Sequence, residues 1–184
     1  MHRNLPNLSI VLGGASSGKS DLAERLVLAR GLSPVYLATA QPFDDEMSAK
    51  IVAHRATRGG LWQTVDCPLD AAGAIRALVP GQIALLDCAT MWLSNHLLAD
   101  SDLAQEEAAL MAALANAPCP VVVVTNEVGQ GVVPDNALAR RFRVAQGGLN
   151  RRLAERAGLV VAVIAGLPIV LKGQMPDEGI EAMK

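Results

Sequence analysis

One short segment constrains the fold of this chain more than any other. Residues Gly13–Ser20 read Gly-Gly-Ala-Ser-Ser-Gly-Lys-Ser and match the pattern G-x-x-x-x-G-K-[ST]. The apolar run Leu8–Leu12 precedes them, and a segment with helical spacing that contains Leu22 and Leu26 follows. Glycines let a backbone wrap closely around phosphates, and the N-terminus of the next helix directs N–H groups at the negative charge. The motif therefore predicts a phosphate-binding loop between a strand and a helix.

Two residues of this loop, and one acid outside it, have distinct expected roles. We expect Lys19 to reach the β and γ phosphates of a nucleotide and Ser20 to ligate Mg²⁺ through its hydroxyl. Asp87 closes the apolar run Ile83–Leu86 where a second metal-side acid would stand, although acids at strand ends also cap turns and helices. The loop residues that we expect to contact the nucleotide are Gly13, Gly14, Ala15, Ser16, Ser17, Gly18, Lys19 and Ser20.

Short aliphatic runs alternate along the chain with longer segments of helical spacing. This order predicts a three-layer α/β domain of the P-loop NTPase type, with a mostly parallel central sheet flanked by helices. The expected strands are Leu8–Leu12, Pro34–Ala38, Ile83–Asp87, Val121–Thr125, Leu159–Ala165 and Ile169–Leu171. The expected helices are Lys19–Arg30, Asp44–Thr57, Asp70–Val79, Thr90–Ala99, Asp102–Ala117 and Asn136–Ala157. We expect residues 1–184 to form a single nucleotide-binding domain, with 173–184 as a mobile C-terminal tail.

Composition excludes several other classes of protein. The net charge is −2, and no block of consecutive Lys or Arg offers a footprint for nucleic acid or for an anionic membrane surface. The three cysteines are odd in number and widely spaced, which favours a reducing compartment. The most apolar stretch, residues 158–171, is too short for a membrane span and is interrupted by Gly166 and Pro168, so a buried strand pair is expected there. We expect a cytoplasmic protein without a secretory signal.

The predicted helix over residues 44–57 carries a histidine with two possible roles. Helical spacing places Met47, Ile51, His54 and Arg58 on one face. Spacing alone favours a packing role for this histidine. In the alternative role, the imidazole of His54 attacks the α-phosphorus of a nucleotide and forms a phosphoramidate, while Arg55 and Arg58 hold the phosphates.

A polar segment, Thr125–Pro134, follows the predicted strand over residues 121–125. Its glycines would allow a substrate to approach the backbone closely, or the segment is a solvent-exposed connection with Asp135 as the cap of the next helix. The residues leave both readings open. The arginines of that next helix are expected on a solvated or subunit-facing surface.

With these motifs assembled, the chain resembles the bifunctional adenosylcobinamide kinase and adenosylcobinamide-phosphate guanylyltransferase family of cobalamin assembly. The resemblance extends over nearly the whole chain. It rests on residues 13–20, 36–40, 44–47, 54–55, 85–88, 125–129 and 166–168.

The resemblance implies two reactions. The first phosphorylates adenosylcobinamide with ATP or GTP, and the second transfers GMP from GTP to adenosylcobinamide phosphate through a GMP-histidine, giving adenosylcobinamide-GDP and pyrophosphate. The matching histidine is His54, so the resemblance favours the nucleophile over the packing role. It also implies a homotrimer, Mg²⁺ held by Ser20 and Asp87, and nucleotide contacts beyond the loop. Those contacts would be Ala38, Thr39, Ala40, Arg55, Ala56, Thr57, Arg58, Asp66 and Asp87.

Two other classes of function remain open at this point. A plain P-loop kinase of another small metabolite would need Lys19, Ser20 and Asp87 but no covalent intermediate. A non-catalytic nucleotide switch would use the same loop, with the segment Thr125–Pro134 changing its order to control a partner protein.

Overall fold

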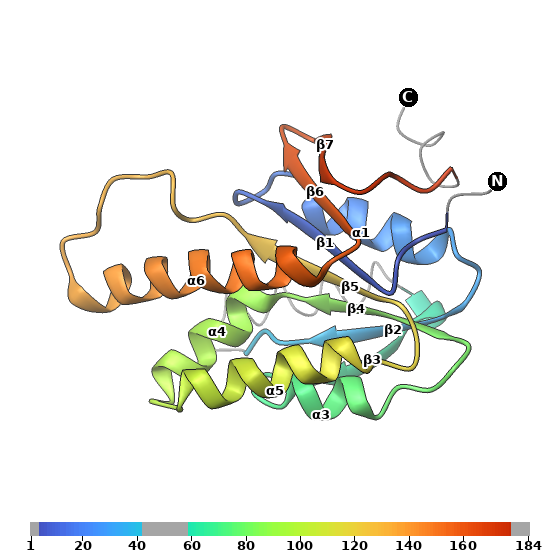
Figure 1. Ribbon diagram of the computed structural model, residues 1–184, viewed down its shortest axis with the longest axis horizontal. Helices are drawn as coiled ribbons and strands as arrows, with labels where there is room; N and C mark the ends of the chain where they lie inside the picture. The colour runs from blue at the N-terminus through green and yellow to red at the C-terminus, as the bar shows by residue number, and fades with distance from the viewer. Residues whose placement is uncertain (1–3, 42–58, 178–184) are drawn as a thin grey trace.

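The chain folds into one sheet with helices on both faces (Figure 1). The computed structural model describes residues 4–41 and 59–177. The strands are β1 (Leu8–Gly13), β2 (Ser33–Ala38), β3 (Gln63–Asp66), β4 (Gln82–Asp87), β5 (Val121–Asn126), β6 (Leu159–Ile164) and β7 (Leu167–Lys172). The helices are α1 (Lys19–Leu28), α3 (Ala71–Arg76), α4 (Ala89–Leu98), α5 (Leu103–Ala115) and α6 (Ala137–Arg156), with a 3₁₀ turn at Gly59–Leu61. The expected three-layer α/β fold is confirmed.

The described strands pair in the order β3-β2-β4-β5-β1-β6-β7. All of these neighbours are parallel except β6 and β7, which form an antiparallel hairpin. Parallel strands end at the same edge of a sheet, where the loops that follow them collect. The residues that follow β1, β2, β3, β4 and β5 therefore meet at one carboxyl edge.

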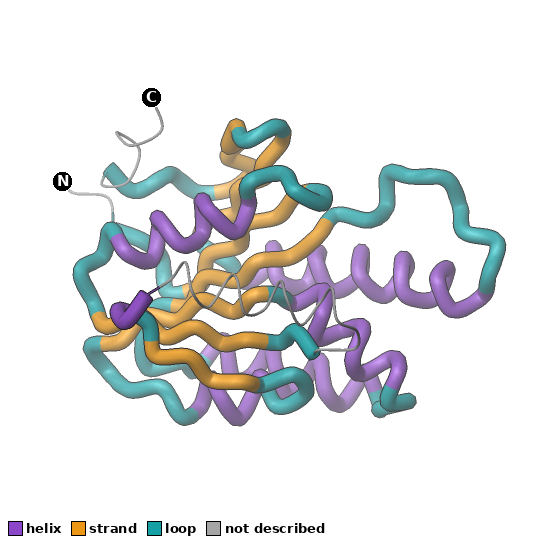
Figure 2. The backbone as a smooth tube through the Cα atoms, turned by 180° about the vertical axis from the view of Figure 1, so that it is seen from behind, coloured by secondary structure: helices purple, strands orange, loops and turns teal. Residues whose placement is uncertain are grey.

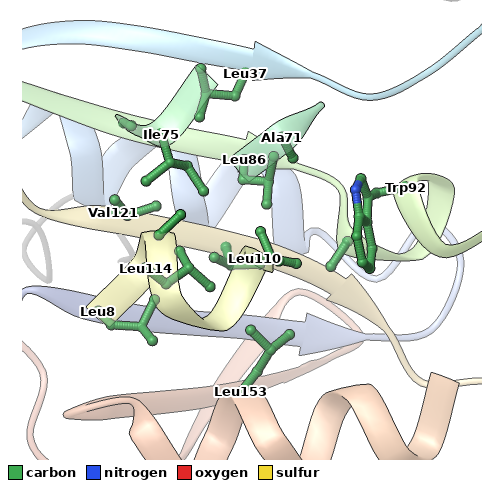
Figure 3. Packing of buried hydrophobic residues seen from close by; sticks show 14 of the residues in the cluster. Leu8, Leu37, Ala71, Ile75, Leu86, Trp92, Leu110, Leu114, Val121 and Leu153 are labelled. Carbon is green, nitrogen blue, oxygen red and sulfur yellow. The ribbon is translucent and has the colours of Figure 1, made fainter. Parts of the chain in front are cut away.

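Two clusters of buried apolar side chains hold the layers together. On one face of the sheet, Leu22 and Leu26 of α1 pack against the strands. The other face is covered by α3, α4, α5 and α6, an arrangement seen from behind in Figure 2. There Leu86 of β4 meets Ile75 of α3 and Leu110 of α5 (Figure 3). Central strands buried on both faces explain the continuous apolar runs in the sequence.

The apolar stretch 158–171 differs from the expectation. The first strand of the expected pair, β6, is mainly buried, but β7 is exposed along nearly its whole length, with Leu167 at 69% of its full accessibility. Side chains of a strand alternate between the two faces of the sheet, and those of β7, the edge strand, are exposed on both, so the described helices do not cover this strand. The expectation of a fully buried strand pair is therefore wrong for β7.

Two local features also differ from the sequence prediction. The strand β3 was not expected, since its four residues, Gln-Thr-Val-Asp, form no apolar run and lie at the other edge of the sheet. The cap of α6 is Asn136, whose side chain accepts from Ala139 N at 2.7 Å, rather than Asp135. Short polar edge strands and neighbouring capping residues are features that sequence patterns resolve poorly.

Some expectations fall on parts of the chain that the structure does not describe. The predicted helix over residues 44–57 and the end of the predicted tail, residues 178–184, lie outside the described residues. Before that end, Met175 packs against the apolar cluster on the α1 face and Pro176 is buried. None of the helices described within residues 4–41 and 59–177 combines the length and apolar character that a membrane crossing requires.

Candidate nucleotide-binding site

The loop between β1 and α1 has the backbone that a phosphate cradle needs. Gly18 caps α1 with φ 89° and without a side-chain hydrogen bond to the first turn. A Cβ atom at Gly13 would lie 2.5 Å from both the Ser17 Oγ and the Val163 backbone oxygen, so only glycine fits there. The first N–H groups of α1 thus face a loop with little side-chain bulk. This geometry, together with the positive end of the helix dipole, suits a bound phosphate.

Segments distant in sequence fix the two ends of this loop. Glu127 N, directly after β5, donates to the Gly13 oxygen at 3.1 Å. Gly166 N, in the turn between β6 and β7, donates to the Ser17 oxygen at 2.9 Å. The Lys19 ammonium donates to the Gly14 oxygen at 3.1 Å and therefore lies against the loop. The β5 exit and the β6–β7 turn both brace the phosphate loop.

Two acids stand in one row at the carboxyl edge of the sheet. The strand register pairs Ala38 with Asp66 on one side and with Asp87 on the other. Directly paired residues of parallel strands direct their side chains to the same face. Asp66 is exposed and Asp87 is half-buried, and Asp87 Oδ2 accepts a hydrogen bond from the Tyr36 hydroxyl at 2.7 Å. The structure thus brings Ala38, Asp66 and Asp87 together at the carboxyl edge of the sheet.

Thr39 has no free polar atom to offer a ligand. It is fully buried, and its hydroxyl both donates to the Cys88 oxygen at 2.8 Å and accepts from Cys88 N at 2.7 Å. Its backbone N donates to the Asp87 oxygen, and its oxygen accepts from the Asn95 amide. Thr39 therefore ties β2 to the junction of β4 and α4, and a nucleotide contact at this position would be apolar.

The cysteines beside the two acids are not reactive groups. Burial, then the charge of Asp87, raises the pKa of Cys88 to about 11, while the nearby Lys19 ammonium opposes that shift. Burial and the charges of Asp66 and Asp70 raise the pKa of Cys67 to about 12. Both thiols therefore stay protonated near neutral pH, which disfavours them as nucleophiles.

The oxygen ligands at this edge fit Mg²⁺. The described residues contain no group of three or more His, Cys, Asp or Glu side chains that could enclose a metal. Magnesium ions are commonly held by one or two protein oxygens together with substrate phosphates. Ser20 at the start of α1 and Asp87 at the end of β4 carry oxygens of this kind.

The nucleophile predicted by resemblance cannot be placed in this geometry. His54, Arg55, Ala56, Thr57 and Arg58 all lie outside the described residues. Of the other histidines, His96 is buried in α4, and its Nε2 lies 3.1 Å from the Leu69 oxygen, which gives it a structural role.

A buried polar network behind the site was missed by the sequence analysis. Gln146 and Asn150, one helical turn apart on α6, bind the end of β5: Gln146 donates to Thr125 Oγ1 at 2.9 Å, and Asn150 donates to the Asn126 oxygen at 3.0 Å. Thr90 of α4 accepts from Asn126 N at 2.7 Å. The sequence held one signal for this network: two side-chain amides, Gln146 and Asn150, one turn apart on the face of α6 that packs against the sheet. This network fixes the β5 exit that supports the phosphate loop.

The polar segment Thr125–Pro134 begins at the end of β5 and becomes exposed to solvent from residue 129 onward. Val132 is 95% exposed, and the residues around it are exposed as well. Arginines of α6 hold the base of the segment, Arg143 through the Gly129 oxygen and Arg140 through the Pro134 oxygen. The first two residues thus belong to the site, while residues 129–133 form a solvent-exposed connection.

Comparisons with known proteins agree on one family. A family model described as cobinamide kinase / cobinamide phosphate guanyltransferase matches residues 9–171. The chain is 45% identical over 168 residues to the bifunctional adenosylcobalamin biosynthesis protein CobP of Pseudomonas aeruginosa, across 90% of this chain and 97% of that protein. It is 41% identical over 181 residues to the bifunctional adenosylcobalamin biosynthesis protein CobU of Salmonella typhimurium, across 89% of this chain and 98% of that protein.

Among solved structures, a RadB recombinase is similar with a TM-score of 0.55. It has 17% sequence identity, and the match covers 96% of this chain and 86% of that one. At this identity the likeness shows the fold alone.

Proposed function

The chain belongs to the cobinamide kinase / cobinamide phosphate guanyltransferase family, and on that premise we propose that it phosphorylates adenosylcobinamide and then transfers GMP to the product. The observation that carries the proposal is the carboxyl edge of the sheet. There a glycine-rich loop with Lys19 follows β1, and the in-register acids Asp66 and Asp87 end β3 and β4 at the same edge. This edge offers a phosphate-binding loop. It also offers a surface for the rest of a nucleotide, the nucleotide wall, which consists of Ala38, Ala40, Asp66 and Asp87.

In the kinase step, the substrate hydroxyl oxygen attacks the γ-phosphorus of the triphosphate. The bond to the bridging oxygen breaks, the nucleoside diphosphate leaves with the electron pair, and the hydroxyl proton is released. The backbone N–H groups of residues 14–18 and the Lys19 ammonium stabilise the charge on the phosphate oxygens. When bound at Ser20 and Asp87, Mg²⁺ would neutralise further oxygen charge.

In the guanylyl step, one imidazole nitrogen of His54 attacks the α-phosphorus of GTP, and pyrophosphate leaves. A phosphate oxygen of adenosylcobinamide phosphate then attacks the same phosphorus. The P–N bond breaks, which frees His54 and forms adenosylcobinamide-GDP. Arg55 and Arg58 would hold the phosphates during both displacements.

The remaining finer features of the proposal concern assembly and location. We propose a homotrimer on the basis of the family resemblance, with GTP and ATP as substrates and with no nucleic-acid partner. The three cysteines are free and buried, which supports a reducing, cytoplasmic location. The proposed nucleotide contacts are those of the phosphate loop, together with Ala38, Ala40, Arg55, Ala56, Thr57, Arg58, Asp66 and Asp87, and with Thr39 as an apolar contact.

The two activities can be tested with purified protein, Mg²⁺ and adenosylcobinamide. With ATP, we expect adenosylcobinamide phosphate by mass spectrometry. After addition of GTP, we expect adenosylcobinamide-GDP and an equal amount of pyrophosphate over many turnovers. Phosphorylation of a non-corrinoid alcohol without pyrophosphate release would favour a plain kinase instead. Nucleotide binding without any turnover would favour the switch.

The role of Asp87 can be tested through its neighbour. The variant Tyr36→Phe removes the hydroxyl that donates to Asp87 Oδ2 but keeps the ring, which packs edge-on against Trp62 at 5.9 Å. We expect the variant to need about tenfold more Mg²⁺ for half-maximal kinase activity, because the carboxylate loses a bond that orients it. A magnesium titration measures this. An unchanged titration curve would show that Asp87 does not hold the ion.

A further inference from the structure

One helix, α4, holds the exits of four neighbouring strands. It begins directly after β4, and Thr90 near its start accepts from Asn126 N at the end of β5. Further along, Asn95 binds the segments that follow β2 and β3. These four strands are consecutive in the sheet order β3-β2-β4-β5. The helix therefore fixes the relative positions of the loops from which the proposed nucleotide wall is built.

The contact at Asn95 is the most specific of these. Its amide nitrogen donates to the Thr39 oxygen, after β2, and to the Pro68 oxygen, after β3, each at 2.8 Å. Both amide hydrogens are thus used, and they join two loops that have no sequence continuity. Asn95 is 3% exposed, so water cannot replace either bond. A buried side-chain amide supplies the two donors needed here without burying a charge.

The rest of the Asn95 amide gives no comparable benefit. Its Oδ1 atom is buried, and no group within residues 4–41 and 59–177 donates a hydrogen bond to it. An unpaired buried acceptor is a cost to folding, so this side chain contributes less stability than a fully satisfied one would. The neighbouring Trp92 and His96 already anchor the β3 exit through the Leu69 oxygen. What Asn95 adds beyond them is the link between the β2 exit and the β3 exit.

These two exits carry proposed nucleotide contacts. Ala38 and Ala40 flank Thr39, and Asp66 lies two residues before Pro68. Because Ala38 and Asp66 are also paired in register, a small change in the separation of the exits alters the wall on both sides. The phosphate loop follows β1 and makes none of these contacts with Asn95. We infer that Asn95 is a positioning residue for guanine nucleotide selectivity, which it sets by holding the β2 and β3 exits at a fixed separation.

This inference rests on the proposed nucleotide site and is tested by direct binding of GTP and ATP to the full chain. The variant Asn95→Leu keeps a similar side-chain volume but removes both donors. We expect its Kd for GTP to rise by about tenfold. Its Kd for ATP should change much less, because contacts to the triphosphate are shared by both nucleotides and the phosphate loop is intact. The ratio of the two Kd values, measured by calorimetry on folded protein, reports selectivity.

A matched variant separates positioning from stability. Leu114 belongs to the apolar cluster on the face of the sheet that α4 covers. It lies beside Val121, the first residue of β5, where the parallel strands begin and therefore opposite the carboxyl edge (Figure 3). Leu114→Ala should lower the unfolding temperature without changing either Kd. If it weakens GTP binding and selectivity as much as Asn95→Leu does, a general loss of stability explains both variants and the inference is wrong.

A second variant covers the case in which Asn95→Leu does not fold. Asn95→Gln keeps the two donors on a side chain one methylene longer, and we expect a Kd for GTP between those of the wild type and the leucine variant. Wild-type selectivity in Asn95→Gln and in any folded Asn95→Leu protein would overturn the inference. Failure of the wild-type protein to bind GTP would instead overturn the proposed function.

Discussion

Replacing Lys19 with alanine is expected to lower kcat/KM of both reactions by about 10²-fold to 10³-fold. The ammonium group already lies on the phosphate loop, 3.1 Å from the Gly14 oxygen. It is therefore placed where the phosphate oxygens of a nucleotide held by the loop would gather charge as a leaving group departs. No other Lys or Arg lies within residues 13–20 to take its place.

Initial rates of the kinase and guanylyl steps, each measured with its own substrates, check this prediction. The control is Lys19→Arg, which keeps the charge on a larger group and should retain more activity than alanine. Circular dichroism and thermal unfolding should show that both variants fold. Undiminished rates in Lys19→Ala would mean that the loop does not hold the reacting phosphates, and the proposed site would have to be moved.

The phosphate loop shows what sequence could predict and why. Two of its glycines are required by geometry within the loop: Ser17 Oγ leaves no room for a Cβ at Gly13, and Gly18 needs a positive φ. Because both requirements arise within the loop, the pattern alone identifies it, although the backbone oxygen of the distant Val163 also crowds Gly13. The aliphatic runs of β1, β4 and β5 are similarly direct, because strands buried on both faces need continuous apolar residues.

The supports of the site depend on contacts between distant segments. Asn95, Gln146 and Asn150 are single polar residues on helices, and nothing in their spacing tells which carbonyl or hydroxyl each will meet. The same holds for Tyr36, which the register places near Asp87 only once β2 and β4 are paired. The positioning residues could therefore be identified only from the tertiary structure, whereas the groups expected to contact phosphate could be predicted from the sequence.

His54 marks the difference between pattern and family resemblance. Its helical spacing favours packing, and only the likeness to a guanylyltransferase family favours a nucleophile. The chemistry makes the two roles easy to separate, because a nucleophile forms a covalent P–N bond and a packing residue does not. The prediction with the largest expected effect follows from this contrast.

Incubation with Mg²⁺ and GTP labelled at the α-phosphate should leave a GMP adduct on His54 of the wild-type protein. The adduct should be labile to acid, stable to alkali, and discharged by adenosylcobinamide phosphate. In His54→Ala, we expect no adduct and a loss of guanylyl transfer of about 10⁴-fold or more, because the reaction loses its nucleophile. The kinase step needs no covalent intermediate, so it should keep most of its rate. Intact-mass analysis and peptide mapping measure the adduct.

The chain contains its own control for the mapped position. There are three histidines, and His96 is buried with its Nε2 beside the Leu69 oxygen, so it cannot reach a nucleotide in the folded protein. Label that stays bound in His54→Ala would show that another residue is the nucleophile. If GTP binds to the wild-type protein but no adduct forms, His54 returns to a packing role. A kinase without a covalent intermediate would then explain Lys19, Ser20 and Asp87, and family membership alone would no longer justify the guanylyl step for this chain.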